Sequence, residues 1–300
     1  MPEGDLRNNG SGVFVVYKNI MFAVVVVVFL CLVVFQPQMA MEGARKGLLL
    51  WYQAILPAQL PFVLGVKLLF KSCSFQKVPA AFLCMLTGMI SGYPVGALSA
   101  AQLYQQGRIC KRNLTMLAAA ANMAGPLFVV GTVGTALLGC ARYGYYLLVV
   151  HWVCAFSMAV LPAWRERSLR REKTARVFNR RRETVMSRVA DTVNETAELM
   201  LKVGVYIVLF SVIRQWVGES VGALLEITGG IEWLAKKTQR TVVLAGVSFL
   251  INFSGSCVLL QSLGAMEGTP VSPMVFLGCK VLQGALGAGL MVVFCQFFLM

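Results

Sequence analysis

The stretch TGMISGYPVGALSA, residues 87–100, lies in an apolar run (79–101) long enough to cross a bilayer, yet it contains Gly92, Pro94 and Gly96. A spanning helix needs about 20 mostly apolar residues. Glycine and proline interrupt a helix, and in hydrocarbon each unpaired backbone N–H or C=O costs several kcal/mol. We therefore predict an interrupted helix that faces protein or a polar cavity.

The composition predicts an all-α polytopic membrane protein. The 300 residues are 58% hydrophobic and 13% charged, whereas soluble domains carry about 25% charged residues. Nine cysteines occur singly and without a CxxC pair, which favours neither a disulfide framework nor a zinc site. We expect the single histidine, His151, to be hydrogen-bonded inside the helix bundle, and we expect no metal or other cofactor.

Nine apolar runs organise the chain. Two of them fit a continuous span poorly: 79–101, and 220–234, which is short and contains Gly229–Gly230. We expect these two to form hairpins and about seven others to span: 20–36, 47–70, 114–139, 143–163, 195–217, 241–264 and 274–299.

The charge distribution gives the orientation of these runs. Ten of the 27 basic residues lie between Arg165 and Arg188, and a Lys/Arg block between apolar segments marks a cytoplasmic loop. If 79–101 spanned the membrane, this block would fall outside. A re-entrant hairpin at 79–101 instead keeps the block inside, together with the basic residues at 108–112. We favour simple topology signalling for this block over specific binding of lipid or nucleic acid, although it could also touch anionic lipid headgroups.

The same placement of basic residues predicts that the second half has the order helix, hairpin, helix, helix and is inserted in the orientation opposite to that of the first half. Such inverted repeats place transporter sites near the bilayer midplane. One observation opposes this arrangement, because Lys236, Lys237 and Arg240 then lie outside. The predicted segments are an N-terminal helix segment (1–46), a first repeat (47–163), a basic cytoplasmic loop (164–192) and a second repeat (193–300).

Polar residues within the apolar runs are candidates for a binding site. Ionisable groups at membrane depth are functional hypotheses by default, and each needs a partner. Glu226 and Lys280 form one candidate pair. We expect Lys67, Lys202 and Arg214, which lie nearer the ends of their runs, to extend toward the interface.

Several motifs carry a family resemblance. LPAQLPFVLGVKLL (56–69), GMISGYPVGA (88–97) and AANMAGPLFVVGTVG (120–134) occur in an order that resembles the YlbJ-type sporulation integral membrane proteins, within the wider nucleoside-recognition (Gate) domain group. In the second half, LLEITGGI (224–231) and NFSGSCVLLQ (252–261) look like a second Gate-like repeat.

The resemblance implies a role in spore formation, in the mother-cell or forespore membrane of a spore-forming bacterium. It also implies a fold related to the core of nucleoside transporters, with interrupted helices around the substrate. By motif match, the candidate substrate-binding residues are Ser91, Gly92, Tyr93, Pro94, Gly96, Asn122, Gly125, Pro126, Glu226, Thr228, Gly255 and Gln261.

Two functions of different class follow from these observations. The first is a transporter-like protein for a small solute, for which a nucleoside-like compound is one candidate. The alternative is a non-transporting membrane scaffold whose basic loop recruits partners or lipid. We expect lipid contact, and either a homo-oligomer or association with other sporulation membrane proteins. We do not expect an enzyme, because the chain has no HExxH and no pair of intramembrane aspartates.

Overall fold

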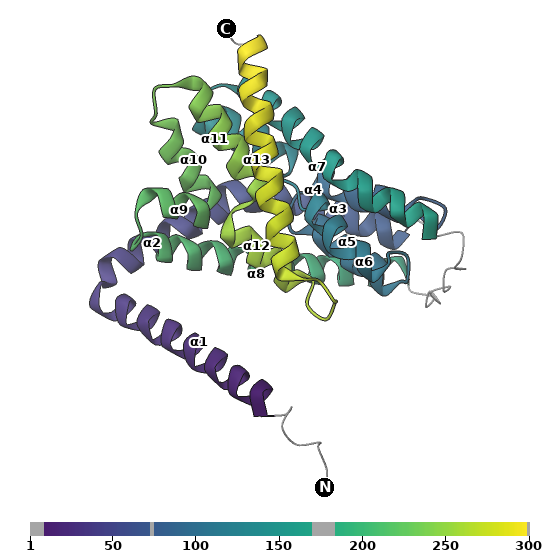
Figure 1. Cartoon of the computed structure of the whole chain (residues 1–300), viewed down its shortest axis with the longest axis horizontal. Coiled ribbons are helices and arrows are strands. Elements are labelled where there is room, and N and C mark those ends of the chain that lie inside the picture. The colour runs from purple at the N-terminus through teal and green to yellow at the C-terminus, as the bar shows by residue number, and fades with distance from the viewer. Residues whose placement is uncertain (1–8, 73–74, 170–183, 299–300) are drawn as a thin grey trace.

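The structure, a computed structural model, describes residues 9–72, 75–169 and 184–298. Within these residues the chain is helical with short connections and no strand (Figure 1), which confirms the all-α prediction. The elements are α1 (Asn9–Phe35), α2 (Pro37–Leu50), η1 (Trp51–Ile55), α3 (Leu56–Ser72), α4 (Ala80–Ser91), α5 (Val95–Gln105), α6 (Lys111–Ala121), η2 (Phe128–Leu137), α7 (Ala141–Leu169), α8 (Val185–Arg214), α9 (Glu219–Leu225), α10 (Ile227–Ala235), α11 (Arg240–Phe253), α12 (Gly255–Ala265) and α13 (Pro273–Phe298).

Five helical segments in the described part of the chain are long and apolar enough to cross a membrane, so the protein is a multi-pass membrane protein. They are Pro37–Ser72, Ala141–Glu166, Val185–Arg214, Arg240–Ala265 and Pro273–Phe298. The apolar part of α1, Asn19–Phe35, is shorter. The predicted span 114–139 is divided between α6 and η2 by an interruption at residues 122–125.

The order of elements in the first half recurs in the second. The first half has a long helix (α2–η1–α3), two short helices around a break (α4, α5), an interrupted helix (α6, η2) and a long helix (α7). The second half has α8, then α9 and α10 around a break, then α11 interrupted before α12, then α13. Each half therefore contributes two breaks.

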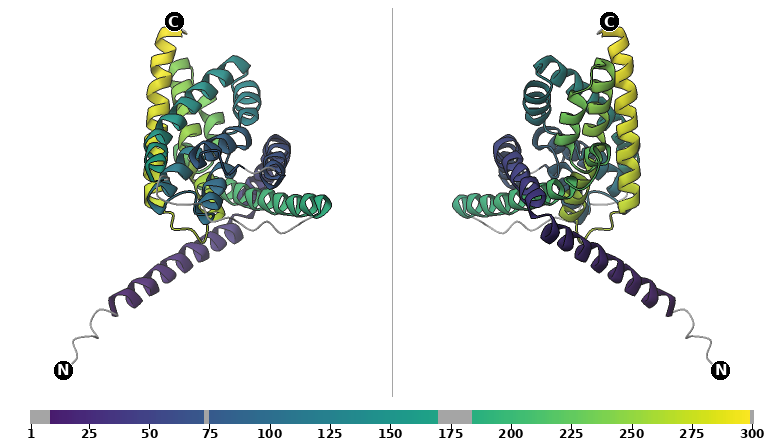
Figure 2. Two further views of the ribbon diagram at one scale, coloured as in Figure 1. Left: turned by 90° about the vertical axis from the view of Figure 1, so that its right-hand side faces the viewer. Right: turned by 90° about the vertical axis from the view of Figure 1, so that its left-hand side faces the viewer.

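The long helices do not all run in one direction. The α2–α3 segment packs along α8, and α11 packs along α13. Figures 1 and 2 show α8 lying across the direction of α13, with α1 extending away from the other helices. Because α8 and α13 differ in direction, they cannot both lie parallel to one membrane normal.

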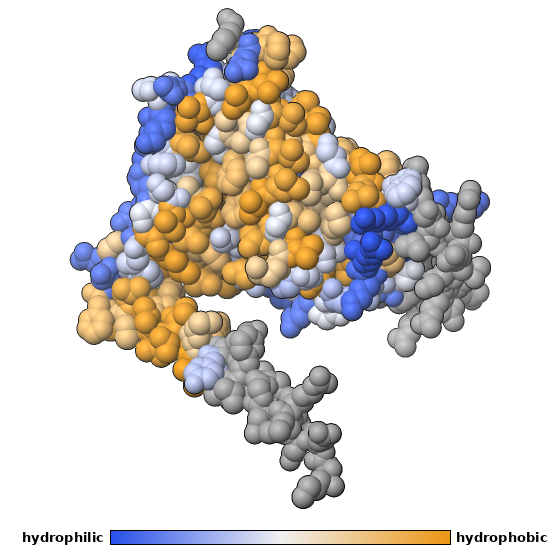
Figure 3. Space-filling model, viewed as in Figure 1, coloured by the Kyte–Doolittle hydropathy of each residue, from blue (hydrophilic) through white to orange (hydrophobic). Residues whose placement is uncertain are grey.

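The surface is apolar over the helices that face outward. Figure 3 shows a continuous apolar area over α13 and its neighbours, with hydrophilic residues gathered toward the upper left and lower right. Patches of this extent on a monomer mark contact with another apolar medium, which here is the acyl chains of the bilayer. On α13 the exposed large apolar side chains include Met274, Val281, Leu286, Leu290 and Phe297.

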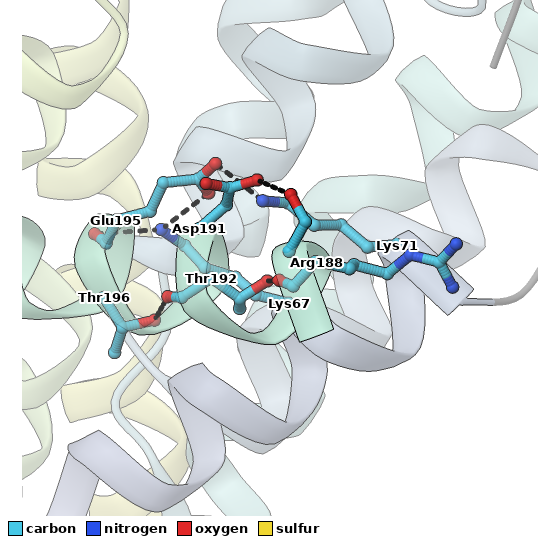
Figure 4. A network of polar contacts seen from close by, with 8 residues as sticks. Lys67, Lys71, Arg188, Asp191, Thr192, Glu195 and Thr196 are labelled. Atoms are coloured by element: carbon cyan, nitrogen blue, oxygen red, sulfur yellow. Dashed lines mark hydrogen bonds and ion pairs between the residues drawn. The ribbon is translucent and has the colours of Figure 1, made fainter. Parts of the chain in front are cut away.

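A charged cluster joins α3 to the N-terminal part of α8 (Figure 4). Lys71 Nζ lies 2.6 Å from Glu195 Oε1, and Lys67 Nζ donates to the Glu195 backbone oxygen at 3.2 Å. Lys67 thus pairs with a neighbouring helix, whereas the exposed Lys202 pairs with Glu198 on its own helix. Of the predicted loop 164–192, residues 170–183 lie outside the described residues, and α7 and α8 occupy parts of the remainder.

Candidate functional site

The first break separates α4 from α5 at the GYP of the opening motif. Gly92 has φ +77° and ψ −171°, a backbone region that essentially only glycine occupies. The Tyr93–Pro94 peptide bond is cis. A Cβ added to Gly92 would lie 2.8 Å from the backbone nitrogen of Gly125. Gly92 therefore brings the first break into contact with the second.

The second break runs from Asn122 to Gly125, between α6 and the helical turn that leads into η2. The carbonyl oxygen of Ala121, the last residue of α6, rests on Gly88 and Gly96, and a Cβ on either glycine would overlap it. Gly96 and Gly125 thus act in close backbone packing between the two breaks. The prediction of an interruption at Gly125–Pro126 is confirmed.

The third break lies at Glu226, between α9 and α10. The Glu226 carboxylate accepts hydrogen bonds from the backbone N–H groups of Thr228 and Gly229, both at 2.8 Å. A side-chain oxygen that accepts from these positions caps a helix N-terminus. The sequence prediction of a break at Gly229–Gly230 was wrong, because both glycines lie inside α10.

Gly229 and Gly230 are explained by close packing. Arg214 Nη2, at the end of α8, donates to the Gly229 carbonyl oxygen at 2.8 Å, and the guanidinium occupies the space that a Cβ on Gly229 would take. A Cβ on Gly230 would lie 2.8 Å from the Ala223 backbone. Arg214 therefore holds the α9–α10 pair, and its extension toward the interface stays a prediction.

Replacement of Gly229 by alanine is expected to destabilise the protein by roughly 1–3 kcal/mol, because the new methyl group displaces the Arg214 guanidinium. Chemical unfolding of the purified protein measures this. Gly278→Ala is the matched control, since nothing lies within 4 Å of a Cβ at Gly278. In an Arg214→Ala background the cost of Gly229→Ala should shrink, as a double-mutant cycle would record. An unchanged cost in that background would contradict the assignment.

The fourth break separates α11 from α12 at Ser254–Gly255, where both residues have positive φ, +76° and +65°. Ser256 Oγ donates to the Leu224 carbonyl oxygen at 3.2 Å, and a Cβ on Gly255 would lie 3.0 Å from Ile227. The third and fourth breaks are therefore in contact in the second half, as the first and second breaks are in the first half. The sequence prediction treated 241–264 as one helix and missed this interruption, although the SGS that follows Asn252 could have indicated it.

A buried polar network joins the second break to the fourth. His151 Nε2 accepts from the Ala124 N–H at 2.9 Å, so its proton lies on Nδ1, which donates to Asn252 Oδ1 at 2.8 Å. Ser262 Oγ, on α12, donates to Asn122 Oδ1 at 2.9 Å. The prediction of an internally hydrogen-bonded His151 is confirmed. Ser262 was missed, because a lone serine in an apolar helix carries no distinguishing pattern.

Lys280 lies at one edge of this network and is fully buried on α13. Its Nζ donates to the Asn122 carbonyl oxygen and to Gln283 Oε1, each at 2.9 Å. The suggested pair of Lys280 with Glu226 was wrong, because the Glu226 carboxylate binds the N-terminus of α10 and no ion pair joins the two side chains.

A cavity lies between the two halves, and several of the predicted site residues line it. Its lining is Leu50, Ile55, Gln59, Tyr93, Phe128, Val203, Ile207, Glu226, Ile227, Thr228, Cys257, Val258 and Gln261. Within it, the Tyr93 hydroxyl and Gln59 Oε1 are buried and have no hydrogen-bond partner. The space open to the centre of a water molecule is about 30 Å³, enough for about two waters.

The remaining predicted site residues do not line the cavity. Ser91 Oγ donates to the Phe62 carbonyl oxygen at 3.4 Å. The cavity lining does not include Gly92, Pro94, Gly96, Asn122, Gly125, Pro126, Gly255 or Lys280. Gln59, which belongs to the LPAQLP segment, was not predicted, although a glutamine in an apolar run was a usable signal.

Comparison with known proteins gives one informative similarity. The chain is 25% identical to the sporulation integral membrane protein YlbJ of Bacillus subtilis (strain 168), over an alignment of 321 positions that covers 85% of this chain and 78% of that protein. No family model matches the chain, and no solved structure matches it.

Proposed function

Because the chain is a homologue of the YlbJ-type sporulation integral membrane proteins, we propose that it serves spore formation as a transporter-like protein that binds a small solute in the cavity between its halves. The observation that carries the proposal is that Tyr93, from the first break, and Glu226, from the third, line the same cavity. We place the protein in the mother-cell or forespore membrane, and no enzymatic step enters the proposal.

The chemistry of the cavity supports a polar, uncharged or cationic solute. A carboxylate, two side-chain amides and two hydroxyls converge among apolar walls, which is the usual lining of small-molecule sites. A buried polar atom without a partner costs about 1–3 kcal/mol. A solute that hydrogen-bonds the Tyr93 hydroxyl and Gln59 Oε1 would remove that cost. The resemblance to the Gate group makes a nucleoside-like solute one candidate.

The size of the cavity implies a closed conformation. Space for about two waters is far below the roughly 300–1,000 Å³ of typical ligand pockets, so a solute requires the cavity to widen. Two of its walls come from breaks, at Tyr93 and at Glu226–Thr228, where short helices can pivot. We propose that the α4–α5 and α9–α10 pairs move apart to admit the solute.

The packing against α13 supports inverted repeats with re-entrant hairpins. Near its start, α6 meets the beginning of α13, where the Ser272 N–H donates to Thr115 Oγ1 at 3.2 Å. The start of α11 meets the other end, where Thr241 contacts Cys295. The two interrupted helices therefore run oppositely along α13. The α4 and α5 helices, of 12 and 11 residues, extend about 18 Å and about 17 Å, too little for a hydrocarbon core of about 30 Å.

Solute binding can be tested by thermal unfolding of the purified protein against a panel of nucleosides, nucleobases and amines. We expect at least one compound to raise the unfolding midpoint. Tyr93→Phe should weaken the affinity for that compound about 2- to 10-fold, because one hydrogen bond contributes about 0.5–1.5 kcal/mol. If the compound is an amine, Glu226→Gln should weaken its affinity further. Tyr145→Phe, at an exposed tyrosine on α7, is the control.

The scaffold hypothesis makes the opposite prediction. It expects no stabilising compound, and it expects spore formation to survive Tyr93→Phe while failing when the basic residues of the 164–192 loop are neutralised. That pair of results would overturn the transporter proposal.

A further inference from the structure

Lys280, on α13, contacts the C-terminal end of α6, which is the first half of an interrupted helix. Asn122 is the residue that follows the last turn of α6, and its carbonyl oxygen accepts from Lys280 Nζ at 2.9 Å. The final carbonyls of a helix have no partner within the helix, and they form the negative end of its dipole. The lysine thus places its Nζ at the point where the first half of the broken helix ends.

The partners of Lys280 are neutral oxygens. Besides Asn122, the ammonium donates to Gln283 Oε1 at 2.9 Å, and no salt bridge involves Lys280 in the part of the chain described here. A lysine ammonium offers three donors and no acceptor, which matches surroundings that present carbonyl oxygens. A buried charge held only by carbonyl dipoles is costly, so Lys280 is an unusual choice for a merely structural residue.

Carbonyl oxygens at a helix break are also the ligands of monovalent metal cations. In secondary transporters, unwound backbone and the C-terminal ends of half-helices coordinate Na⁺. Here Gln283 Nε2 donates to Asn252 Oδ1 at 3.4 Å, which orients the Gln283 amide so that its oxygen accepts from Lys280 Nζ. The oxygens around Lys280 Nζ therefore resemble a metal-cation site in which the cation is part of the chain.

We propose that Lys280 is a tethered cation, which replaces a bound monovalent metal ion at the α6 break. The closed arrangement of the second and fourth breaks then needs no Na⁺ or K⁺ from solution. The inference extends beyond solute binding and does not depend on it, since it concerns the charge that stabilises the breaks when no solute is present.

The test measures the thermal unfolding midpoint without any solute, in NaCl and in choline chloride of equal concentration. The wild-type midpoint should be the same in both salts. Lys280→Ala leaves the carbonyl oxygens in place and opens a space beside them. We expect its midpoint to be lowered by several degrees in choline chloride, and to recover saturably with Na⁺ or methylammonium, which fit the vacated space where choline does not.

Two further variants keep the test decisive if Lys280→Ala does not fold. Lys280→Met fills the same space without charge, and Lys280→Arg keeps the charge; we expect only Lys280→Arg to approach the wild-type midpoint. Lys202→Ala, at an exposed lysine, controls for nonspecific salt effects. The proposal is overturned if Lys280→Met is as stable as wild type, or if a folded Lys280→Ala shows the same midpoint in both salts. Failure here leaves the cavity proposal standing, because no solute enters the measurement.

Discussion

Gly92→Ala is expected to lower the free energy of unfolding by about 3 kcal/mol or more, through two separate effects. The φ of +77° and ψ of −171° at this position cost a residue with a side chain of order 1–3 kcal/mol. The new Cβ would also lie 2.8 Å from the Gly125 nitrogen, and overpacking of this kind costs about 1–3 kcal/mol. Unfolding of the purified protein in detergent by denaturant measures the sum.

Gly107→Ala separates these two effects. Gly107 also has a positive φ, +71°, but nothing lies within 4 Å of a Cβ added there. This variant should show the backbone cost alone, and Gly92→Ala should exceed it clearly. An equal loss of unfolding free energy in the two variants would mean that the first and second breaks are not packed as described.

His151→Leu is the second large effect, with an expected loss of about 2–5 kcal/mol. The change leaves the Ala124 N–H and Asn252 Oδ1 buried without their present partner, and each such group costs about 1–3 kcal/mol. The same unfolding experiment checks it.

Ser157→Ala, on the same helix, serves as the control for His151→Leu. Ser157 is exposed, and its hydroxyl donates only to Val153 O within α7, so this change should be nearly neutral. If His151→Leu were equally neutral, the network that links the two halves would contribute nothing to stability.

The apolar content of the chain and the glycine and proline residues within its apolar runs were sufficient to predict much of this architecture. The GYP segment and the Gly125–Pro126 pair indicated breaks correctly, because glycine and proline act on the backbone of their own position. Asn122, Tyr93, Glu226 and Lys280 stood out because polar groups are rare in apolar helices. His151 was correctly expected to be buried and hydrogen-bonded.

The misassigned elements depend on contacts that are distant in the sequence. Gly229–Gly230 looked like a break, but both glycines are required by Arg214 and Ala223, which approach from other elements. The break at Glu226 arises from a side chain that caps its own helix. Lys280 meets Asn122 across 158 positions, so the Glu226 pairing could not be rejected by spacing. The direction of α8 relative to α13 (Figure 2) likewise has no local sequence signal.

The most direct test of the central proposal, two inverted halves around one cavity, is the side of the membrane on which each hairpin connects to its interrupted helix. Single cysteines at Gln106, between α5 and α6, and at Thr238, between α10 and α11, would be introduced at these exposed positions in a variant without the native cysteines. A membrane-impermeant maleimide applied to intact cells should label Thr238→Cys, and should label Gln106→Cys only after the cells are permeabilised. Labelling of both from the same side would contradict the inverted arrangement.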